Sequence, residues 1–269
     1  MRSIVENKLS SALIMEEDSD WDVNLKAQMT EFARGAHIIQ GVQRTTFSPY
    51  GDNWDMLWLG HCGNRAFGED REENRMIYAI PDDPTVTPPH YRTDFVHPRL
   101  SDKPGFESHR LVFVGEGPIC SWSVAFTYDG ARKALAALSM VGLDQPVDLG
   151  YNSLWSGLLC MPYSCLSTYP SLMGTWAQTG PAVRDSDIVD TDSKDWHEAS
   201  SNRLVYSTML NMGAFVNNST RMKAQWKDVR QPEIDLKTMR IPNGYVYTPD
   251  LPPHDQFLKE VVGVGNIGG

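Results

Sequence analysis

Short apolar runs alternate with stretches of helical periodicity along the first two thirds of the chain. The runs at 11–15 and 55–59 are continuous, which is typical of buried strands. Similar apolar runs predict four further strands, at 76–79, 111–114, 121–127 and 164–168.

Three segments carry the pattern of a helix. Apolar residues at helical spacing predict an amphipathic helix over 22–44, with Asp20 or Asp22 as its N-cap. Good helix formers over 129–141 and the proline that precedes 147–159 predict two more helices. Because strands alternate with helices, we expect an α/β layered fold with a mainly parallel sheet.

Two regions lack this regular pattern. Proline and charged residues dominate 61–108, which we interpret as an irregular excursion around the short strand at 76–79. The chain after about 179 is polar and rich in proline, with one possible helix over 198–212.

The charge balance excludes one class of partner. The 269 residues carry 34 acidic against 24 basic side chains, a net charge of −10. Nucleic acid is therefore not expected as a partner, because phosphate binding needs a basic surface. No run approaches the roughly 20 apolar residues of a membrane span.

Five acids follow the first predicted strand without any lysine or arginine among them. They are Glu16, Glu17, Asp18, Asp20 and Asp22. In α/β sheets ligands bind beyond the carboxyl ends of strands, and carboxylates there are the usual ligands of Mg²⁺ or Mn²⁺. Glu16 and Asp18, two positions apart, would point the same way and share one ion. The alternative for these acids is a solvated loop that caps the next helix. We favour the metal role for Glu16 and Asp18, and we weigh the two interpretations equally for Asp20 and Asp22.

An EF-hand is not expected here. Asp18, Asp20 and Asp22 match its first three ligand positions. Val23 and Met29 stand where that loop needs glycine and a bidentate glutamate.

Three residue types carry weaker signals. Cys160 and Cys165 form a bridge or, by preference, remain buried thiols. The segment 217–220 holds two overlapping glycosylation sequons, which matter only in a secretory compartment. Tryptophans and histidines recur without metal spacing. We interpret most of Trp58, Trp122, Trp155 and Trp176 as core residues, and His61, His90, His97 and His109 as surface residues in loops.

Several segments resemble fungal proteins of glycosyltransferase family 25, which includes lipopolysaccharide and collagen galactosyltransferases. "KLSSALIMEEDSDWDVNLK" is similar to the segment where an apolar strand runs into Glu-Asp-Asp and Asp-Trp-Asp. "WDMLWLGHCG", "CSWSVAFTYDGARKAL" and "QPVDLGYNSLWSG" follow in the family's order, and "YPSLM" and "RDSDI" are weaker matches. The resemblance covers roughly residues 1–190, which we assign to the catalytic core, leaving 191–269 as a C-terminal extension.

The resemblance implies a GT-A fold that binds a nucleotide sugar and a divalent metal, Mn²⁺ or Mg²⁺. Glu16 and Asp18 match the metal-binding acids, and Glu17 stands where the family has aspartate. Asp148 matches the acid near the acceptor and is our candidate base, although it equally suits a helix N-terminus. Glu17 and Asp187 are assigned to substrate binding. The implied reaction is inverting, metal-assisted transfer of a hexose from a UDP-sugar to a hydroxyl of a glycan or protein, with galactose as the preferred candidate for the hexose.

The short segment before Glu16 opposes activity. In this fold, strand–helix units ahead of the metal motif hold the nucleotide, and only 15 residues precede Glu16. We therefore expect an N-terminal truncation, and any signal anchor would belong to the same missing segment. The rivals are a non-catalytic remnant of the fold and an acidic metal-binding module unrelated to sugars.

Overall fold

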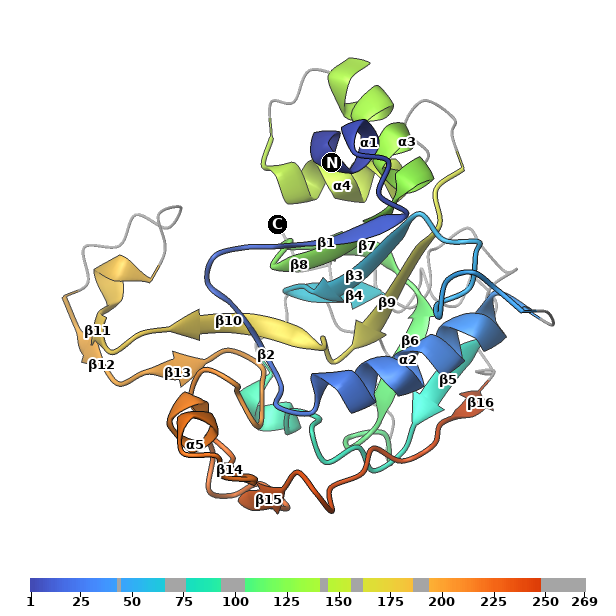
Figure 1. Ribbon diagram of the computed structural model, residues 1–269. Helices are drawn as coiled ribbons and strands as arrows, with labels where there is room; N and C mark the ends of the chain where they lie inside the picture. Colours follow the sequence, from blue (N-terminus) through green and yellow to red (C-terminus); the bar gives the residue numbers. More distant parts are fainter. Residues whose placement is uncertain are drawn as a thin grey trace, which may run out of the picture.

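The computed structural model describes residues 1–42, 45–65, 76–92, 105–140, 145–155, 162–185 and 194–247. In this part of the chain helices pack on both sides of one large mixed sheet (Figure 1). The helices are α1 (Arg2–Glu6), α2 (Leu25–Ile39), α3 (Tyr128–Met140), α4 (Val147–Trp155) and α5 (Met212–Val216), with 3₁₀ turns η2 (Pro89–Tyr91) and η5 (Ala182–Arg184).

The main sheet has ten strands among the described residues. Its central path runs β1-β8-β3-β9-β6-β5-β16. Off this path, β10 pairs with β3, β2 and β13. The strands on this path are β1 (Ser11–Met15), β8 (Ser123–Thr127), β3 (Met56–Gly60), β9 (Cys165–Tyr169), β6 (Arg110–Val114), β5 (Ile77–Ile80) and β16 (Tyr245–Tyr247). The others are β2 (Ser19–Trp21), β10 (Met173–Ala177) and β13 (Ser200–Ser201).

Three two-stranded sheets complete the described strands. They pair β4 (Gly63–Arg65) with β7 (Glu116–Ile119), β11 (Gly180–Pro181) with β12 (Trp196–His197), and β14 (Arg221–Lys223) with β15 (Glu233–Asp235). All six strands predicted from the apolar runs are present, with ends displaced by no more than two residues.

The prediction of a mainly parallel sheet is wrong. Only the pairs β3–β9 and β10–β3 are parallel, and the other described strand pairs are antiparallel. The apolar runs indicated where strands lie but carried no information on their direction, which tertiary pairing sets. One part of the expectation survives. Since β8 is antiparallel to both β1 and β3, the strands β1, β3 and β9 run the same way, with their carboxyl ends at one edge.

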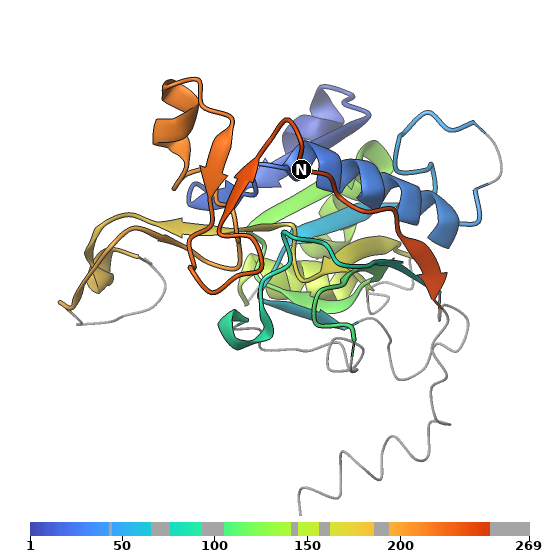
Figure 2. The ribbon, with the colours of Figure 1, turned by 90° about the horizontal axis from the view of Figure 1, so that it is seen from below.

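Alternation along the strands builds a core on each face of the sheet. Met56 and Trp58 pack beneath α3 and α4, while Leu57 and Leu59 pack with α2 on the opposite face. Figures 1 and 2 show α1, α3 and α4 gathered on one side of the sheet and α2 lying across the other. Gly130 lets α3 approach β3 closely, since a side-chain carbon there would overlap the Asp55 carbonyl oxygen.

The first strand is not buried as predicted. In the described part of the chain, β1 has β8 as its one neighbouring strand. Leu13 and Met15 are 45 % and 38 % exposed, and Ile14 is exposed between them. A continuous apolar run is therefore compatible with an edge strand as well as with a central one, and periodicity does not separate the two.

Two predicted helices differ from the structure. The helix expected over 22–44 spans Leu25–Ile39. The N-cap of this helix is Asn24 and not Asp20 or Asp22, and the Asp22 carboxylate accepts the backbone N–H of Asn24. The helix expected over 198–212 is absent from that described segment, which holds β13 and turns. Its backbone N–H groups bond elsewhere: Asn202 donates to the Thr175 carbonyl and Tyr206 to the Asp22 carboxylate.

The C-terminal segment contacts the part of the chain before residue 190. β16 extends the main sheet beyond β5, and the Arg34 side chain on α2 donates to Asn243. No helix in the described residues is long and apolar enough to cross a membrane.

Candidate functional site

One turn, residues 120–122 between β7 and β8, is held in place from several directions and underlies the candidate site. We call it the anchored turn. A disulfide joins Cys120 in this turn to Cys62, which follows β3. The Trp58 indole donates to the Cys120 carbonyl at 2.7 Å, and the Cys62 N–H donates to the Ile119 carbonyl at 2.8 Å. The turn is therefore tied covalently and by hydrogen bonds to the end of a central strand.

The disulfide corrects the expectation for the cysteines. We expected Cys160 and Cys165 to be buried thiols in preference to a bridge, and Cys165 is a free, buried thiol. Burial raises its pKa to about 12, so it is protonated at neutral pH. Cys160 lies outside the described residues. The observed pair, Cys62 and Cys120, is 58 residues apart and carries no spacing signal in the sequence.

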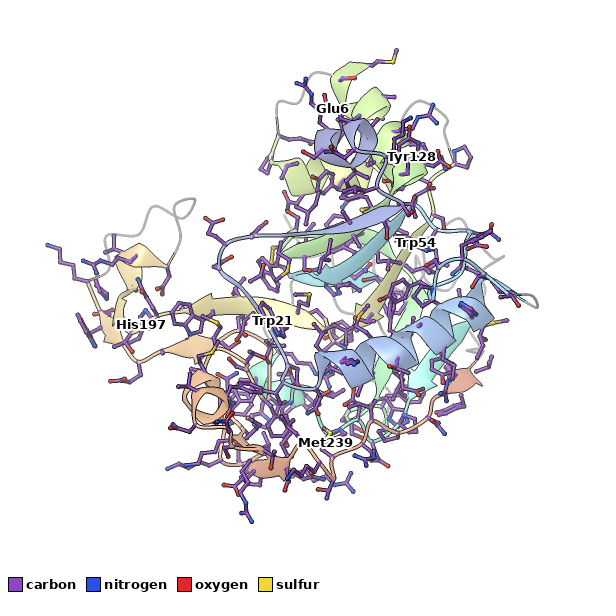
Figure 3. The ribbon with its side chains drawn as sticks, in the orientation of Figure 1. Glu6, Trp21, Trp54, Tyr128, His197 and Met239 are labelled. Atoms are coloured by element: carbon purple, nitrogen blue, oxygen red, sulfur yellow. A yellow bond between two sulfur atoms is a disulfide. The ribbon has the colours of Figure 1, made fainter. Side chains whose placement is uncertain are left out.

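The acids that follow β1 lie against the anchored turn. Their loop, residues 16–18, leaves the edge of the sheet and turns towards β2, where Trp21 lies beside β10 (Figures 1 and 3). The Glu16 N–H donates to the Trp122 carbonyl at 3.0 Å, and the Ser121 hydroxyl donates to Glu16 Oε1 at 2.9 Å. We call Glu16, Glu17 and Asp18 the acidic loop.

Asp148 reaches the same turn from a third segment. It lies in the first turn of α4, and its Oδ2 accepts the backbone N–H of Cys120 at 2.9 Å. It is near enough to Glu16 for the two carboxylates to repel. The structure therefore brings Glu16 together with Ser121 and Asp148, which lie 105 and 132 positions further along the chain.

The pKa values in the acidic loop reflect this crowding. Partial burial raises the pKa of Glu16, and repulsion from Asp18, Glu17 and Asp148 adds to the rise, against the Ser121 hydrogen bond. Partial burial also raises the pKa of Asp18, with repulsion from Glu17. A bound cation would relieve this repulsion, because it favours the ionised form of both carboxylates.

Asp20 and Asp22 lie apart from this surface and belong to the interior. They are 0 % and 1 % exposed, so the expectation of a solvated loop is wrong for both. Asp20 accepts hydrogen bonds from the Ser201 and Ser207 hydroxyls and from the Met209 N–H. Asp22 accepts from Asn24 and Tyr206, and burial raises its pKa to about 7.

A divalent ion fits the acidic loop only in one binding mode. Among the residues that the structure describes, no three His, Cys, Asp or Glu side chains form a group able to hold a metal. Mg²⁺ and Mn²⁺ are, however, commonly held by one or two carboxylates together with water and substrate phosphate oxygens. Glu16 and Asp18 suit this mode. Glu17 is exposed beside them, and Asp187 lies outside the described residues.

Sequence reasoning missed two buried groups beneath this site. The Arg203 guanidinium lies 5.1 Å from the centre of the Trp122 ring, and Arg203 is only 5 % exposed. Burial lowers its pKa to about 10. His61, predicted at the surface, is fully buried and bonds the Thr168 carbonyl at 2.7 Å. Burial lowers its pKa to about 4, so it is neutral at physiological pH. No local pattern marks either residue, because both acquire their surroundings from distant segments.

The aromatic residues follow the expectation in part. Trp58 and Trp122 are buried, as core residues should be, and Trp176 is half-buried.

Comparison of the chain with protein-family models, with curated proteins and with solved structures finds no match.

Proposed function

We propose that this chain is a hexosyltransferase-like protein. In this proposal it binds a UDP-sugar at the acidic loop, and UDP-galactose is the preferred candidate. It transfers the hexose with inversion to a hydroxyl of a glycan or protein acceptor. The observation that supports the proposal is the convergence of Glu16, Ser121 and Asp148, each from a different segment, on the anchored turn.

The acidic loop supplies the site for a cation. Glu16 and Asp18 would hold Mn²⁺ or Mg²⁺, which as a Lewis acid offsets the charge that builds on the leaving diphosphate. Partial burial is the main cause of the raised pKa values of both carboxylates, and repulsion among the acids adds to it; a cation would offset this repulsion. The Ser121 hydroxyl orients Glu16 by donating to one of its oxygens.

Asp148 is the candidate base. The hydrogen bond from Cys120 fixes one carboxylate oxygen and leaves the other to accept a proton. The acceptor oxygen would attack the anomeric carbon from the side opposite the diphosphate. As that bond forms, the bond from the carbon to the diphosphate oxygen breaks, and the hydroxyl proton passes to Asp148. A single displacement of this kind inverts the anomeric carbon without a covalent enzyme intermediate.

A second candidate function is cation binding without sugar transfer. The bond between Asp148 and Cys120 favours it, since that carboxylate already has a structural role in docking α4 onto the anchored turn. In this case the acidic loop would bind Mn²⁺ alone, and Asp148 would stabilise the fold. The two candidates differ in one measurable property, the effect of a nucleotide sugar on metal binding.

Calorimetric titration of the full chain with Mn²⁺, with and without UDP-galactose, tests both candidates. The proposed transferase binds UDP-galactose only with Mn²⁺ present, and Asp18→Asn weakens Mn²⁺ binding by at least about tenfold. Asp148→Asn should lower transfer by about a hundredfold or more. It should weaken Mn²⁺ binding less than Asp18→Asn does, because Asp148 lies near Glu16 but is not a proposed ligand. The matched control is Asp129→Asn, an exposed aspartate that follows the other end of β8.

Three results would count against the proposal. Binding of neither ligand removes both candidate functions. Binding of Mn²⁺ that UDP-galactose does not alter leaves the metal-binding module. If Asp148→Asn retains wild-type transfer, Asp148 is not the base.

A further inference from the structure

Two overlapping glycosylation sequons, Asn217-Asn218-Ser219 and Asn218-Ser219-Thr220, are the only such triplets in the chain. They follow the short helix α5 and precede β14. In both views α5 lies at the periphery of the molecule (Figures 1 and 2). Sequons of this kind have meaning only for a protein that enters a secretory compartment, so the compartment has to be judged from a separate feature.

The disulfide supplies that separate feature. Cys62 and Cys120 are joined, and their bond ties β3 to the anchored turn. Forming the bond removes two electrons and two protons from the thiols, so an external oxidant is needed. Such bonds form and persist in the secretory pathway and outside the cell, whereas thioredoxin and glutathione keep cytosolic thiols reduced. The covalent structure therefore favours an oxidising compartment, where sequons are used.

The geometry of the turn separates the two asparagines. Asn217 and Asn218 are both exposed. The Asn217 side-chain amide donates to the Gly213 carbonyl at 2.8 Å and closes the end of α5. A glycan on that nitrogen would interfere with this hydrogen bond.

Asn218 is placed differently. It has φ of +53°, in the left-handed region that asparagine tolerates better than most residues, and its N–H donates to the Phe215 carbonyl. Within the described part of the chain its side chain makes no hydrogen bond. Its neighbours do: Ser219 bonds the Arg221 backbone and Thr220 bonds Asp235. Asn218 is thus the one polar side chain of 217–220 that can carry a substituent without loss of a contact.

We propose that Asn218 is an N-glycosylation site of this protein. The Asn218 amide nitrogen forms a bond to the anomeric carbon of a lipid-linked oligosaccharide diphosphate. The bond from that carbon to the diphosphate oxygen breaks, the lipid diphosphate leaves, and one amide proton is lost to a base of the transferring enzyme. This site is independent of the hexosyltransferase proposal, because it depends only on the disulfide and on the turn after α5.

The test uses the overlap of the two sequons. The protein is tagged at its own gene, alkylated at lysis and purified from its own cells without reductant. Peptide N-glycosidase should increase its electrophoretic mobility and leave aspartate at position 218 in the peptide mass spectrum. Thr220→Ala removes only the Asn218 sequon, and Ser219→Ala removes only the Asn217 sequon. The glycan should disappear in Thr220→Ala and in Asn218→Gln but persist in Ser219→Ala.

A folding control is needed because Thr220 contacts Asp235. Thr220→Ser keeps both the hydroxyl and the sequon, so it should remain glycosylated. The proposal is overturned if the wild-type protein carries no glycan, or if the glycan persists in Thr220→Ala and disappears in Ser219→Ala. Recovery of Cys62 and Cys120 as alkylated thiols would likewise overturn it, since the oxidising compartment would be lost.

Discussion

The two ends of the acidic segment 16–22 have similar composition and opposite environments. Glu16 and Glu17 are exposed, and Asp18 is half-buried. Asp20 and Asp22 are fully buried. The first group has a single side-chain donor, the Ser121 hydroxyl at Glu16, to offset its mutual repulsion, whereas the second group is surrounded by hydrogen-bond donors. The exposed acids are accessible to a ligand, whereas the buried acids form hydrogen bonds that stabilise the fold.

Four of the donors to Asp20 and Asp22 come from one distant segment. Ser201, Ser207 and Met209 surround Asp20, and the Tyr206 N–H reaches Asp22. These four residues lie about 180 positions further along the chain. These two aspartates are therefore one attachment of the C-terminal segment, beside the pairing of β16 with β5, and this attachment can be broken without touching the acidic loop.

The largest effect is expected from Asp20→Ala. The change leaves the Ser207 hydroxyl and the backbone N–H groups of Trp21 and Met209 without their acceptor, while the Ser201 hydroxyl keeps the Thr175 carbonyl. Each such loss costs about 1–3 kcal/mol, so the free energy of unfolding should fall by about 5 kcal/mol. Urea denaturation followed by circular dichroism measures it.

Asp18→Ala is the matched control for that experiment. It removes the same side chain two positions away, where the residue is half-buried and repelled by Glu17. Its unfolding free energy should stay within about 1 kcal/mol of wild type. Equal destabilisation by the two variants would show that the division of the segment is wrong.

A second prediction concerns pH. Burial raises the pKa of Asp22 from its ordinary 3.8 to about 7, so the folded protein binds this proton more tightly than the unfolded chain. The stability of wild type should therefore be highest, for this group, below pH 3.8 and decline as the pH rises towards 7. The full loss is about 4 kcal/mol, from 1.36 kcal/mol per pKa unit.

Asp22→Asn tests this directly, because an amide does not titrate. Urea titrations at several pH values between 4 and 7 should show the variant gaining stability relative to wild type as the pH rises. A difference between the two proteins that does not change with pH would mean that Asp22 ionises normally in the folded state.

The sequence predicted the strands well and their surroundings poorly. The run 11–15 forms β1 with the same ends, yet Leu13, Ile14 and Met15 are exposed, because β1 lies at the edge of the sheet with β8 as its one described neighbour. The same limit explains the wrong sheet direction. Spacing within one segment determines whether a strand forms, but pairing with other segments determines its orientation and burial.

The candidate site shows the same limit. The position of Glu16 and Asp18 beyond a strand end was predictable from local pattern alone. The disulfide, the buried Arg203 and the burial of His61 were not, because each depends on residues at least 50 positions away. The helix expected over 198–212 failed for the related reason that distant acceptors take its backbone N–H groups.

The smallest expected effect, and the one that bears on function, comes from Glu16→Gln. The glutamine oxygen can still accept the Ser121 hydroxyl, so the change removes charge while keeping the hydrogen bond. Because the pKa of Glu16 is raised in the folded state, its ionisation weakens the fold above its ordinary pKa of 4.5. The variant should therefore gain stability at pH 7 and lose that gain at low pH. Exposure and salt limit the gain to less than about 1 kcal/mol.

Addition of Mn²⁺ at pH 7 should make wild type more stable than Glu16→Gln, since a cation bound at the acidic loop stabilises wild type and not the variant. Asp129→Asn should respond to neither condition. If Mn²⁺ raises the melting temperature of wild type and of Glu16→Gln equally, the cation binds elsewhere and the acidic loop is not its site.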